Sequence, residues 1–226
     1  ERLAALGEMS ARVAHEVNNP LGIIKNYLLL IKRAATGNIE AGNYLDIVGQ
    51  EIDRIARIVR ELLDFHRPEK AASQPVDVLT VIEDVLVLMD RQFENTRIEV
   101  VRDYAPSLPL VMGSPENIKQ VVLNIVLNAC DAMPEGGRLR IAVNRVRHGI
   151  HIGFCDTGPG IPPEIIPRIF EPFFTTKEEG KGTGLGLAVC YGIIKRHGGT
   201  ITYKNTEVGG CFEIILPAVV ERDNHE

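Results

Sequence analysis

An apolar stripe with helical spacing runs through the first part of the sequence. Its members recur at steps of three and four residues: Leu6, Met9, Val13, Val17, Leu21, Ile24, Leu28 and Ile31. This spacing predicts an amphipathic helix over residues 1–35 with one buried face. Because each residue turns a helix by about 100°, His15 lies about 200° from Val13 and Val17, on the opposite and exposed face. Pro20 removes a backbone donor one turn later and predicts a bend there.

A second helix is predicted to end near His66. Gly37 and Asn38 stop the first helix, since such residues adopt the left-handed conformation of a C-terminal cap. The second helix has its own stripe at steps of four and three: Val48, Ile52, Ile55, Val59 and Leu62. Two helices joined by a short loop form an antiparallel hairpin, which buries too little apolar surface by itself. We expect two hairpins to pair into a homodimeric four-helix bundle; the alternative is that the helices pack on the rest of the same chain.

Charge and composition exclude several classes of partner. The 226-residue chain has a formal net charge of −5, so it offers no basic field for nucleic acid or acidic lipid. No apolar run is long enough to span a bilayer and no signal peptide is recognisable, so we expect a cytoplasmic location without membrane contact by this part of the chain. The cysteines are widely spaced, and we expect them to be reduced core residues: Cys130, Cys155, Cys190 and Cys211. The first stripe is already in phase at Leu3, which suggests an upstream sensor domain and leaves a membrane anchor elsewhere open.

A polar segment bounded by Pro68 and Pro75 predicts a domain boundary, with residues 1–70 as the hairpin and residues 71–226 as a second domain. The pattern then changes to short alternating runs between helical stripes, which predicts an α+β chain. Strands are predicted at residues 76–78, 98–101, 139–145, 150–155, 200–204 and 210–216, and helices at residues 79–93, 114–132 and 187–197. Residues 156–186 are rich in glycine and proline and too long for a connector, so we expect a functional lid at about 157–183.

The helix at residues 114–132 carries a polar face beside its apolar one. Ser114 and Pro115 mark its start. The polar face consists of Asn117, Gln120, Asn124, Asn128 and Asp131. Asparagine is a poor interior helix residue, and amide oxygens on one face can hold a hydrated Mg²⁺ that also binds substrate phosphates. An ordinary solvated face is the alternative.

Two further segments suggest a nucleotide. Asp156 ends a predicted strand, where a carboxylate can accept a hydrogen bond from an exocyclic amine such as that of adenine, and the glycines after it allow close approach of backbone to a ring. A glycine-rich run over residues 180–187 leads into a helix, so that its N–H groups can face a phosphate, with charge added by Lys177 and Lys181. The orders of residues that define a P-loop or a dinucleotide fingerprint are both absent from the sequence.

Together these motifs resemble the catalytic core of bacterial two-component sensor histidine kinases. The segment with His15, Glu16, Asn18, Asn19, Pro20 and Leu21 resembles their H-box. Asn124, Asn128 and Ala129 resemble the N-box; Asp156, Gly158 and Gly160 the first glycine box; residues 170–174 the F-box; and Gly182, Gly184 and Gly186 the second glycine box. The motifs occur in the family's order and cover essentially the whole chain. The resemblance implies a dimeric histidine-phosphotransfer hairpin followed by an α/β-sandwich ATP-binding domain, a mixed sheet with helices on one face.

The resemblance also implies roles for particular residues. Asp156 would read the adenine amine, and Asn128 with Asn124 would bind the Mg²⁺ on the ATP phosphates. The lid would wrap the triphosphate through Gly158, Gly160, Lys177, Gly182, Thr183, Gly184, Leu185 and Gly186, with Phe170 and Phe173 anchoring it. His15 would attack the γ-phosphate, Glu16 would accept or orient its proton, and the phosphoryl group would pass to an aspartate of a response-regulator receiver domain. Asn19, one turn after His15, matches a family element that dephosphorylates the regulator.

One residue departs from the pattern of many family members. Asp131 stands where they carry a basic residue that neutralises phosphate, which would leave that role to Mg²⁺ and Lys177. The other histidines lack an acidic neighbour of this kind and are interpreted as structural or surface residues: His66, His148, His151, His197 and His225.

Three other functions remain open from the sequence. One is an ATP-driven conformational machine on the same nucleotide fold, but such proteins place a glutamate at the position of Asn124, and asparagine is a poor base. Another is a dimeric scaffold that binds nucleotide without catalysis. The third is a protein deficient in transfer that acts mainly as a phosphatase.

Overall fold

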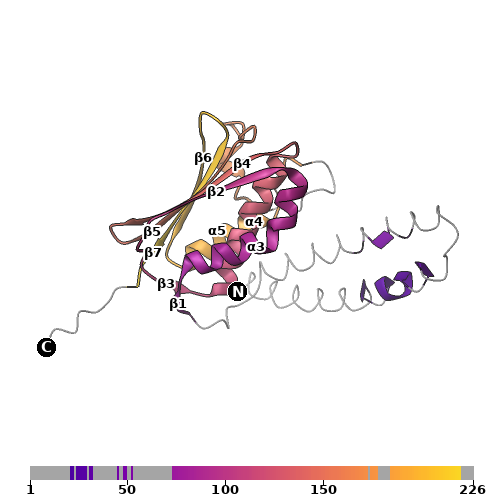
Figure 1. Cartoon of the computed structure of the whole chain (residues 1–226), viewed down its shortest axis with the longest axis horizontal. Helices are drawn as coiled ribbons and strands as arrows, with labels where there is room; N and C mark the ends of the chain where they lie inside the picture. Colours follow the sequence, from indigo (N-terminus) through magenta and orange to yellow (C-terminus); the bar gives the residue numbers. More distant parts are fainter. Residues whose placement is uncertain are drawn as a thin grey trace. The chain divides into compact units, whose positions relative to one another are not determined.

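The computed structural model describes residues 21–22, 24–29, 31–32, 45, 48–49, 52, 73–172, 174–177 and 184–219. The chain divides into two compact units, Glu1–Pro68 and Glu69–Glu226 (Figure 1). Each unit is described by itself.

The first unit is helical at every residue that the structure describes in it. His15, Glu16 and Asn19 lie outside the described residues. Members of the predicted stripes are exposed in the single chain, Ile24 at 46%, Ile31 at 52% and Val48 at 43%. No helix in the described part of the chain is long and apolar enough to cross a membrane.

The second unit alternates strands and helices as the sequence predicts. Its elements are β1 (Gln74–Val76), α3 (Val78–Thr96), β2 (Ile98–Tyr104), β3 (Val111–Gly113), α4 (Pro115–Ala132), β4 (Gly137–Val146), β5 (Gly149–Asp156), the short 3₁₀ helix η1 (Ile166–Arg168), α5 (Gly186–Arg196), β6 (Thr200–Asn205) and β7 (Gly210–Pro217). The predicted helices and strands are found within a few residues of their expected bounds. The sequence does not predict β3, a three-residue strand that pairs with β1.

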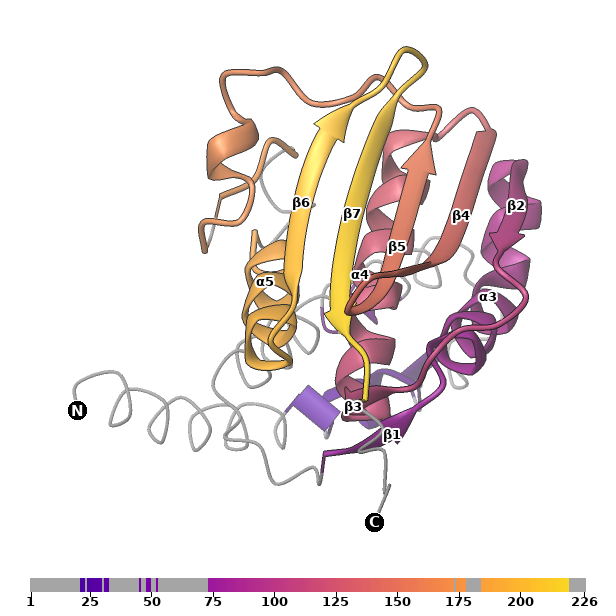
Figure 2. The same ribbon diagram turned by 90° about the vertical axis from the view of Figure 1, so that its left-hand side faces the viewer.

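The strands form one mixed sheet covered by helices on one side. Its order is β2-β4-β5-β7-β6, with β2 parallel to β4 and the remaining neighbours antiparallel. The helices α3, α4 and α5 lie on the same side of this sheet (Figure 2). A separate antiparallel pair joins β1 to β3. The predicted mixed sheet with helices on one face is therefore confirmed.

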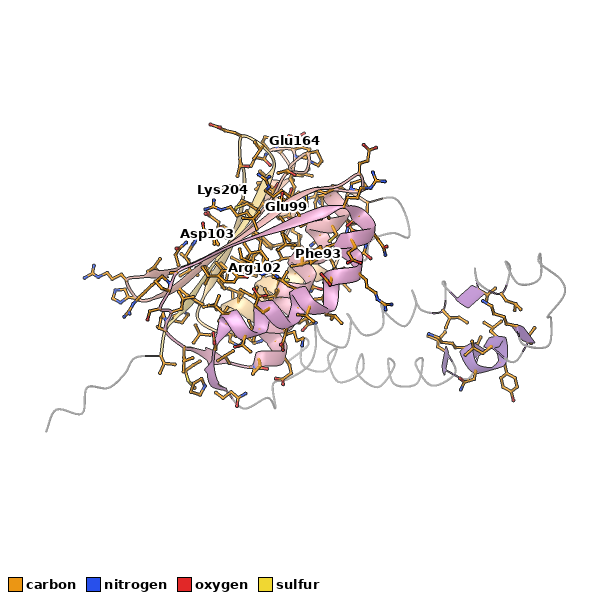
Figure 3. The ribbon with its side chains drawn as sticks, in the orientation of Figure 1. Phe93, Glu99, Arg102, Asp103, Glu164 and Lys204 are labelled. Atoms are coloured by element: carbon orange, nitrogen blue, oxygen red, sulfur yellow. A yellow bond between two sulfur atoms is a disulfide. The ribbon has the colours of Figure 1, made fainter. Side chains whose placement is uncertain are left out.

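Alternation along the strands separates the two faces of the sheet. Side chains that face the helices are fully buried, among them Leu139 and Ile141 on β4 and Phe154 on β5. On the open face, Arg138 of β4 donates to Glu99 of β2 at 3.0 Å. Arg140 pairs in the same way with Asp103 (Figure 3). Ion pairs therefore connect β2 to β4 on the face opposite α3, α4 and α5.

Caps and a histidine fix the helices that carry the polar motifs. Ser114 caps α4 by accepting from the N–H of Asn117 at 3.3 Å, with Pro115 in the first turn, as predicted. At the end of α5, Nδ1 of His197 lies 2.8 Å from the carbonyl oxygen of Ile193, and its Nε2 accepts from the N–H of Ser114 at 3.2 Å. The start of α4 is thereby joined to the end of α5, and the interpretation of His197 as structural is confirmed.

The expectation that all cysteines are reduced is wrong for one pair. Cys155 on β5 and Cys211 on β7 form a disulfide, while Cys130 and Cys190 are free and buried. The strand register brings the pair together, because it places Cys155 directly opposite Cys211 on the neighbouring strand. Wide spacing in the sequence did not reveal this pairing.

Candidate nucleotide-binding site

A buried carboxylate lies where β5 ends. Asp156 is 8% exposed, and among the described residues only Ser114 is a comparably buried polar residue. Its Oδ1 accepts from the N–H of Gly158 at 2.9 Å and from the N–H of Gly210 at 3.4 Å. Burial raises the pKa of Asp156, while these N–H groups act in the lowering direction. The group is a fixed hydrogen-bond acceptor that still has Oδ2 for a ligand.

The backbone after Asp156 fits only glycine at two positions. A Cβ on Gly158 would lie 2.9 Å from the carbonyl oxygen of Ala132 at the end of α4. Gly160 has a φ of +72°, in the left-handed region, and a Cβ there would lie 2.6 Å from Oδ1 of Asn205. These glycines let the segment pass close to α4 and to the β6–β7 hairpin (Figure 2).

Asn205 holds the start of the lid, a role that was not predicted from the sequence. Its Nδ2 donates to the carbonyl oxygen of Ile161 at 2.7 Å, and its Oδ1 accepts from the N–H of the same residue at 2.9 Å. Tyr203 also donates to Oδ1 of Asn205, at 3.1 Å. A polar residue at the end of a strand is common, so only the folded arrangement identifies this contact.

The polar face of α4 meets the start of α5. Asn124 is half-buried, and its Nδ2 donates to the carbonyl oxygen of Gly186, the first residue of α5, at 3.3 Å. Asn128 lies one turn further along α4, also half-buried. The structure therefore brings Asn124 next to the glycine-rich start of α5, with Asn128 one turn away on the same helix.

A lysine of the lid segment reaches the same face of α4. Nζ of Lys177 lies 2.5 Å from Oδ2 of Asp131 and 3.4 Å from Oδ1 of Asn128. Asp131 and Lys177 are both partly exposed. An ammonium group therefore lies beside the amide oxygen that the sequence assigns to a metal ion.

Aromatic contacts fix the middle of the lid segment. Phe170 packs on the hydrophobic core, and its ring centroid lies 5.6 Å from that of Tyr191 on α5. The guanidinium of Arg168 lies over the ring of Phe174, 4.4 Å from its centroid. Phe170 is therefore placed to anchor the lid segment. Its contact with Tyr191 was not predicted from the sequence.

The remaining predicted residues fall into two groups. Phe173, Gly182 and Thr183 lie outside the described residues. Gly184 has a φ of +68°, and Gly186 opens α5. Leu185 is 1% exposed, so its side chain belongs to the interior and only its backbone can face a ligand.

A cavity of about 390 Å³ lies elsewhere, between α3 and β2, and is lined by Phe93, Arg97 and Arg102 among others. None of the predicted nucleotide-binding residues lines it. Within the described residues, no group of three or more His, Cys, Asp and Glu side chains could hold a metal ion. A cation at the α4 face would have amide oxygens, the carboxylate of Asp131 and oxygens that a ligand supplies.

The arrangement offers complementary groups for an amine and for phosphates. The carboxylate of Asp156 can accept from an exocyclic amine, and the amides of α4, the start of α5 and Lys177 can face anionic oxygens. Of these groups, the α4 amides contact the start of α5 and Lys177 directly.

Two families match consecutive parts of the chain. Residues 5–71 match the His Kinase A (phospho-acceptor) domain. Residues 113–220 match the family of histidine kinase-, DNA gyrase B- and HSP90-like ATPases, and this range contains every predicted residue of the nucleotide site.

Curated relatives are kinases that are longer than this chain. The sensor histidine kinase ZraS of Escherichia coli (strain K12) is 37% identical over 223 residues, which are 98% of this chain and 48% of that protein. Sporulation kinase A of Bacillus subtilis (strain 168) is 37% identical over 219 residues, 96% of this chain and 35% of that protein. The chain therefore spans half or less of the length of these relatives.

Solved structures give the same assignment. The catalytic domain of histidine kinase ThkA is 33% identical, with a TM-score of 0.61 over 65% of this chain and 95% of that one. ThkA in complex with the response regulator protein TrrA is 32% identical, with a TM-score of 0.71 over 97% of this chain and 64% of that one. The chain belongs to the two-component sensor histidine kinases and carries the phospho-acceptor and ATPase-like domains of their catalytic core.

Proposed function

We propose that this chain transfers the γ-phosphoryl group of ATP to His15 and then to an aspartate of a response-regulator receiver domain. The observations that carry the proposal are the buried carboxylate of Asp156 at the end of β5 and the contact of Asn124 on α4 with the start of α5, in a domain of the histidine kinase family. Asparagine at position 124, rather than a glutamate that could activate water, favours transfer over hydrolysis.

The nucleotide would be held at both ends. Asp156 would accept from the adenine amine through Oδ2, the oxygen that neither Gly158 nor Gly210 uses. Gly158 and Gly160 allow the backbone to approach the ring. The phosphates would face the lid and the start of α5, through the backbone of Gly184, Leu185 and Gly186 and through Lys177, with Gly182 and Thr183 added by resemblance.

The side chains of α4 fit a magnesium ion that arrives with the nucleotide. Oδ1 of Asn128 already lies 3.4 Å from an ammonium, so its surroundings accept positive charge. Asn128, with Asn124, would hold the ion, which would neutralise phosphate charge. With few protein ligands, the ion would keep waters and phosphate oxygens, as Mg²⁺ prefers.

The transfer itself asks the protein mainly for positioning and charge neutralisation. A ring nitrogen of His15 must be neutral and in line with the γ-phosphate, and Glu16 would hydrogen-bond the other nitrogen or accept its proton. Glu16→Gln is expected to retain ATP binding and lose transfer. Asn19 would position a water against the phosphorylated regulator, so Asn19→Ala is expected to lose phosphatase activity.

The active form would be a homodimer. The exposed apolar side chains of Ile24, Ile31 and Val48 support this proposal, because pairing of two hairpins would cover such stripes. The match to a phospho-acceptor domain and the complex of ThkA with TrrA support a receiver domain as the second partner. We place this reaction in the cytoplasm.

The proposal is tested by following label to its destination. The dimeric chain is incubated with γ-labelled ATP and Mg²⁺, freed of nucleotide, and mixed with candidate receiver domains. We expect label to move to the aspartate of one receiver domain, and Asn128→Ala to abolish both labelling and transfer. Release of phosphate from ATP without labelled protein would show an ATPase instead, and binding without either reaction would show a scaffold.

A further inference from the structure

The contact between Lys177 and Asp131 lies beside Asn128, the residue proposed to hold the magnesium ion that accompanies the nucleotide. The ammonium of Lys177 lies between two oxygens of α4, Oδ2 of Asp131 at 2.5 Å and Oδ1 of Asn128 at 3.4 Å. Asn128 and Asp131 are three residues apart and therefore neighbours on one helix face. The lid segment and α4, 46 residues apart in sequence, are joined here by one cation.

This cation stands where another is expected. In the proposed function, the same oxygen of Asn128 faces the magnesium ion that accompanies ATP. Two cations cannot share that oxygen without repulsion, so the ammonium of Lys177 must move when the metal–nucleotide complex enters. Its new partners would be phosphate oxygens, for which lysine is a suitable point charge.

Asp131 opposes that move. Its carboxylate holds the lysine against α4 and places a negative charge beside the proposed site for an anion. The pair is partly exposed, Lys177 at 36% and Asp131 at 56%, so the opposition is modest.

We propose that Asp131 is a positioning residue. It pairs with Lys177 and keeps it at α4 until a nucleotide binds, and Lys177 then moves to the phosphates of ATP. This inference rests on the proposed nucleotide site and adds a determinant of ligand choice. A ligand without phosphates can bind Asp156 but has no anionic oxygen for Lys177, so the ion pair between Lys177 and Asp131 stays intact. A ligand with phosphates must break the pair and then gains the lysine.

The test compares two ligands on matched variants. Dissociation constants of Mg-ATP and of adenosine are measured by calorimetry for the wild type, Asp131→Asn, Lys177→Met and the double variant. Asp84→Asn is the control, because Asp84 forms a similarly exposed ion pair with Lys119, at 3.4 Å, between α3 and α4 and away from the site. Far-ultraviolet circular dichroism verifies that each variant is folded.

We expect Asp131→Asn to bind Mg-ATP about two- to fivefold more tightly and adenosine unchanged, which is the range of an exposed ion pair. Lys177→Met should bind Mg-ATP more weakly, and in that background the gain from Asp131→Asn should vanish. Asp84→Asn should match the wild type.

Two results would overturn the proposal. Weaker or unchanged ATP binding by Asp131→Asn would show that the carboxylate does not hold the lysine back. A gain that persists without Lys177 would show that Asp131 acts by its charge alone. Failure of the wild type to bind either ligand would instead overturn the nucleotide site itself, and the role of Asp131 with it.

Discussion

Cys155 on β5 lies directly opposite Cys211 on β7, and a disulfide joins them one residue before Asp156 and one residue after Gly210. The bond closes a loop between positions 56 residues apart, for which loss of chain entropy in the unfolded state predicts roughly 4 kcal/mol of stabilisation. Adding a thiol reductant should therefore lower the midpoint of thermal unfolding by on the order of 10 °C. Calorimetry with and without reductant measures the shift.

Counting thiols provides the control. Unfolded, unreduced protein should show only the two thiols of Cys130 and Cys190. In the folded protein these should alkylate slowly at pH 8, because burial raises the pKa of Cys130 to about 11 and that of Cys190 to about 12. In Cys211→Ser the reductant should have no effect on unfolding. Four thiols in the unreduced wild type would contradict the pairing.

The pH dependence of nucleotide binding should carry the signature of Asp156. Burial raises the pKa of this carboxyl above its ordinary value of 3.8. Protonation removes the charge that accepts from the adenine amine. As pH is lowered, affinity for ATP should therefore begin to fall at a higher pH than it would with an ordinary carboxylate at this position. Dissociation constants measured over a pH series for the wild type and Asp156→Asn isolate this dependence as the difference between the two curves. Parallel curves would remove Asp156 from the site.

The same substitution separates binding from stability. A carboxyl whose pKa is higher in the folded state favours folding at acidic pH, and this contribution is lost as pH rises through the folded pKa. At neutral pH the buried carboxylate therefore costs stability, and Asp156→Asn, which keeps an acceptor for Gly158, should not lower the free energy of unfolding. It should weaken ATP binding by roughly 10- to 100-fold, since a hydrogen bond to a charged group is lost. Loss of stability with unchanged affinity would assign the residue to the scaffold alone.

Gly158→Ala should damage the site by steric conflict. The new Cβ would lie 2.9 Å from the carbonyl oxygen of Ala132 and from Oδ1 of Asp156, so the segment must shift. We expect a loss of about 1–3 kcal/mol in stability and weaker ATP binding. Gly153→Ala is the matched control on β5, because its Cβ meets nothing closer than a His151 ring atom at 3.8 Å. Equal behaviour of the two variants would show that the close approach to α4 has no role.

Asn205→Ala should release the start of the lid. Both hydrogen bonds to Ile161 are lost, a cost of about 1–2 kcal/mol for partly exposed bonds. Hydrogen exchange at the N–H of Ile161 should quicken by about tenfold, and affinity for ATP should fall. Thr202→Ala, on the open face of the same strand, should change neither. Unaltered exchange at Ile161 would show that Asn205 does not hold this segment.

Local signals account for most of the fold that the sequence predicted. The start of α4 has a capping serine and a proline, and β4 alternates more exposed with buried residues from Arg138 to Val143, so each is specified by its own residues. Register and pairing are different, because they depend on partners far along the chain. The short strand β3 and the placement of Cys155 opposite Cys211 therefore appear only in the structure.

The candidate site divides in the same way. Asp156 and the amides of α4 were predictable, since their residue types are unusual for a strand end and a helix face. The contacts of Asn205 with Ile161 and of Lys177 with Asp131 join positions 44 and 46 residues apart, and no spacing rule connects them. The sequence left the second group open because exposed asparagine, lysine and aspartate are ordinary surface residues.

The central claim is that ATP held at Asp156 and Asn128 phosphorylates His15. The most direct measurement is labelling of the chain with γ-labelled ATP and Mg²⁺ in the wild type, His15→Gln and a control, His66→Gln. We predict label that is labile to acid and stable to base in the wild type and in His66→Gln, and none in His15→Gln. Label that persists in His15→Gln, or hydrolysis of ATP with no labelled protein, would contradict the account.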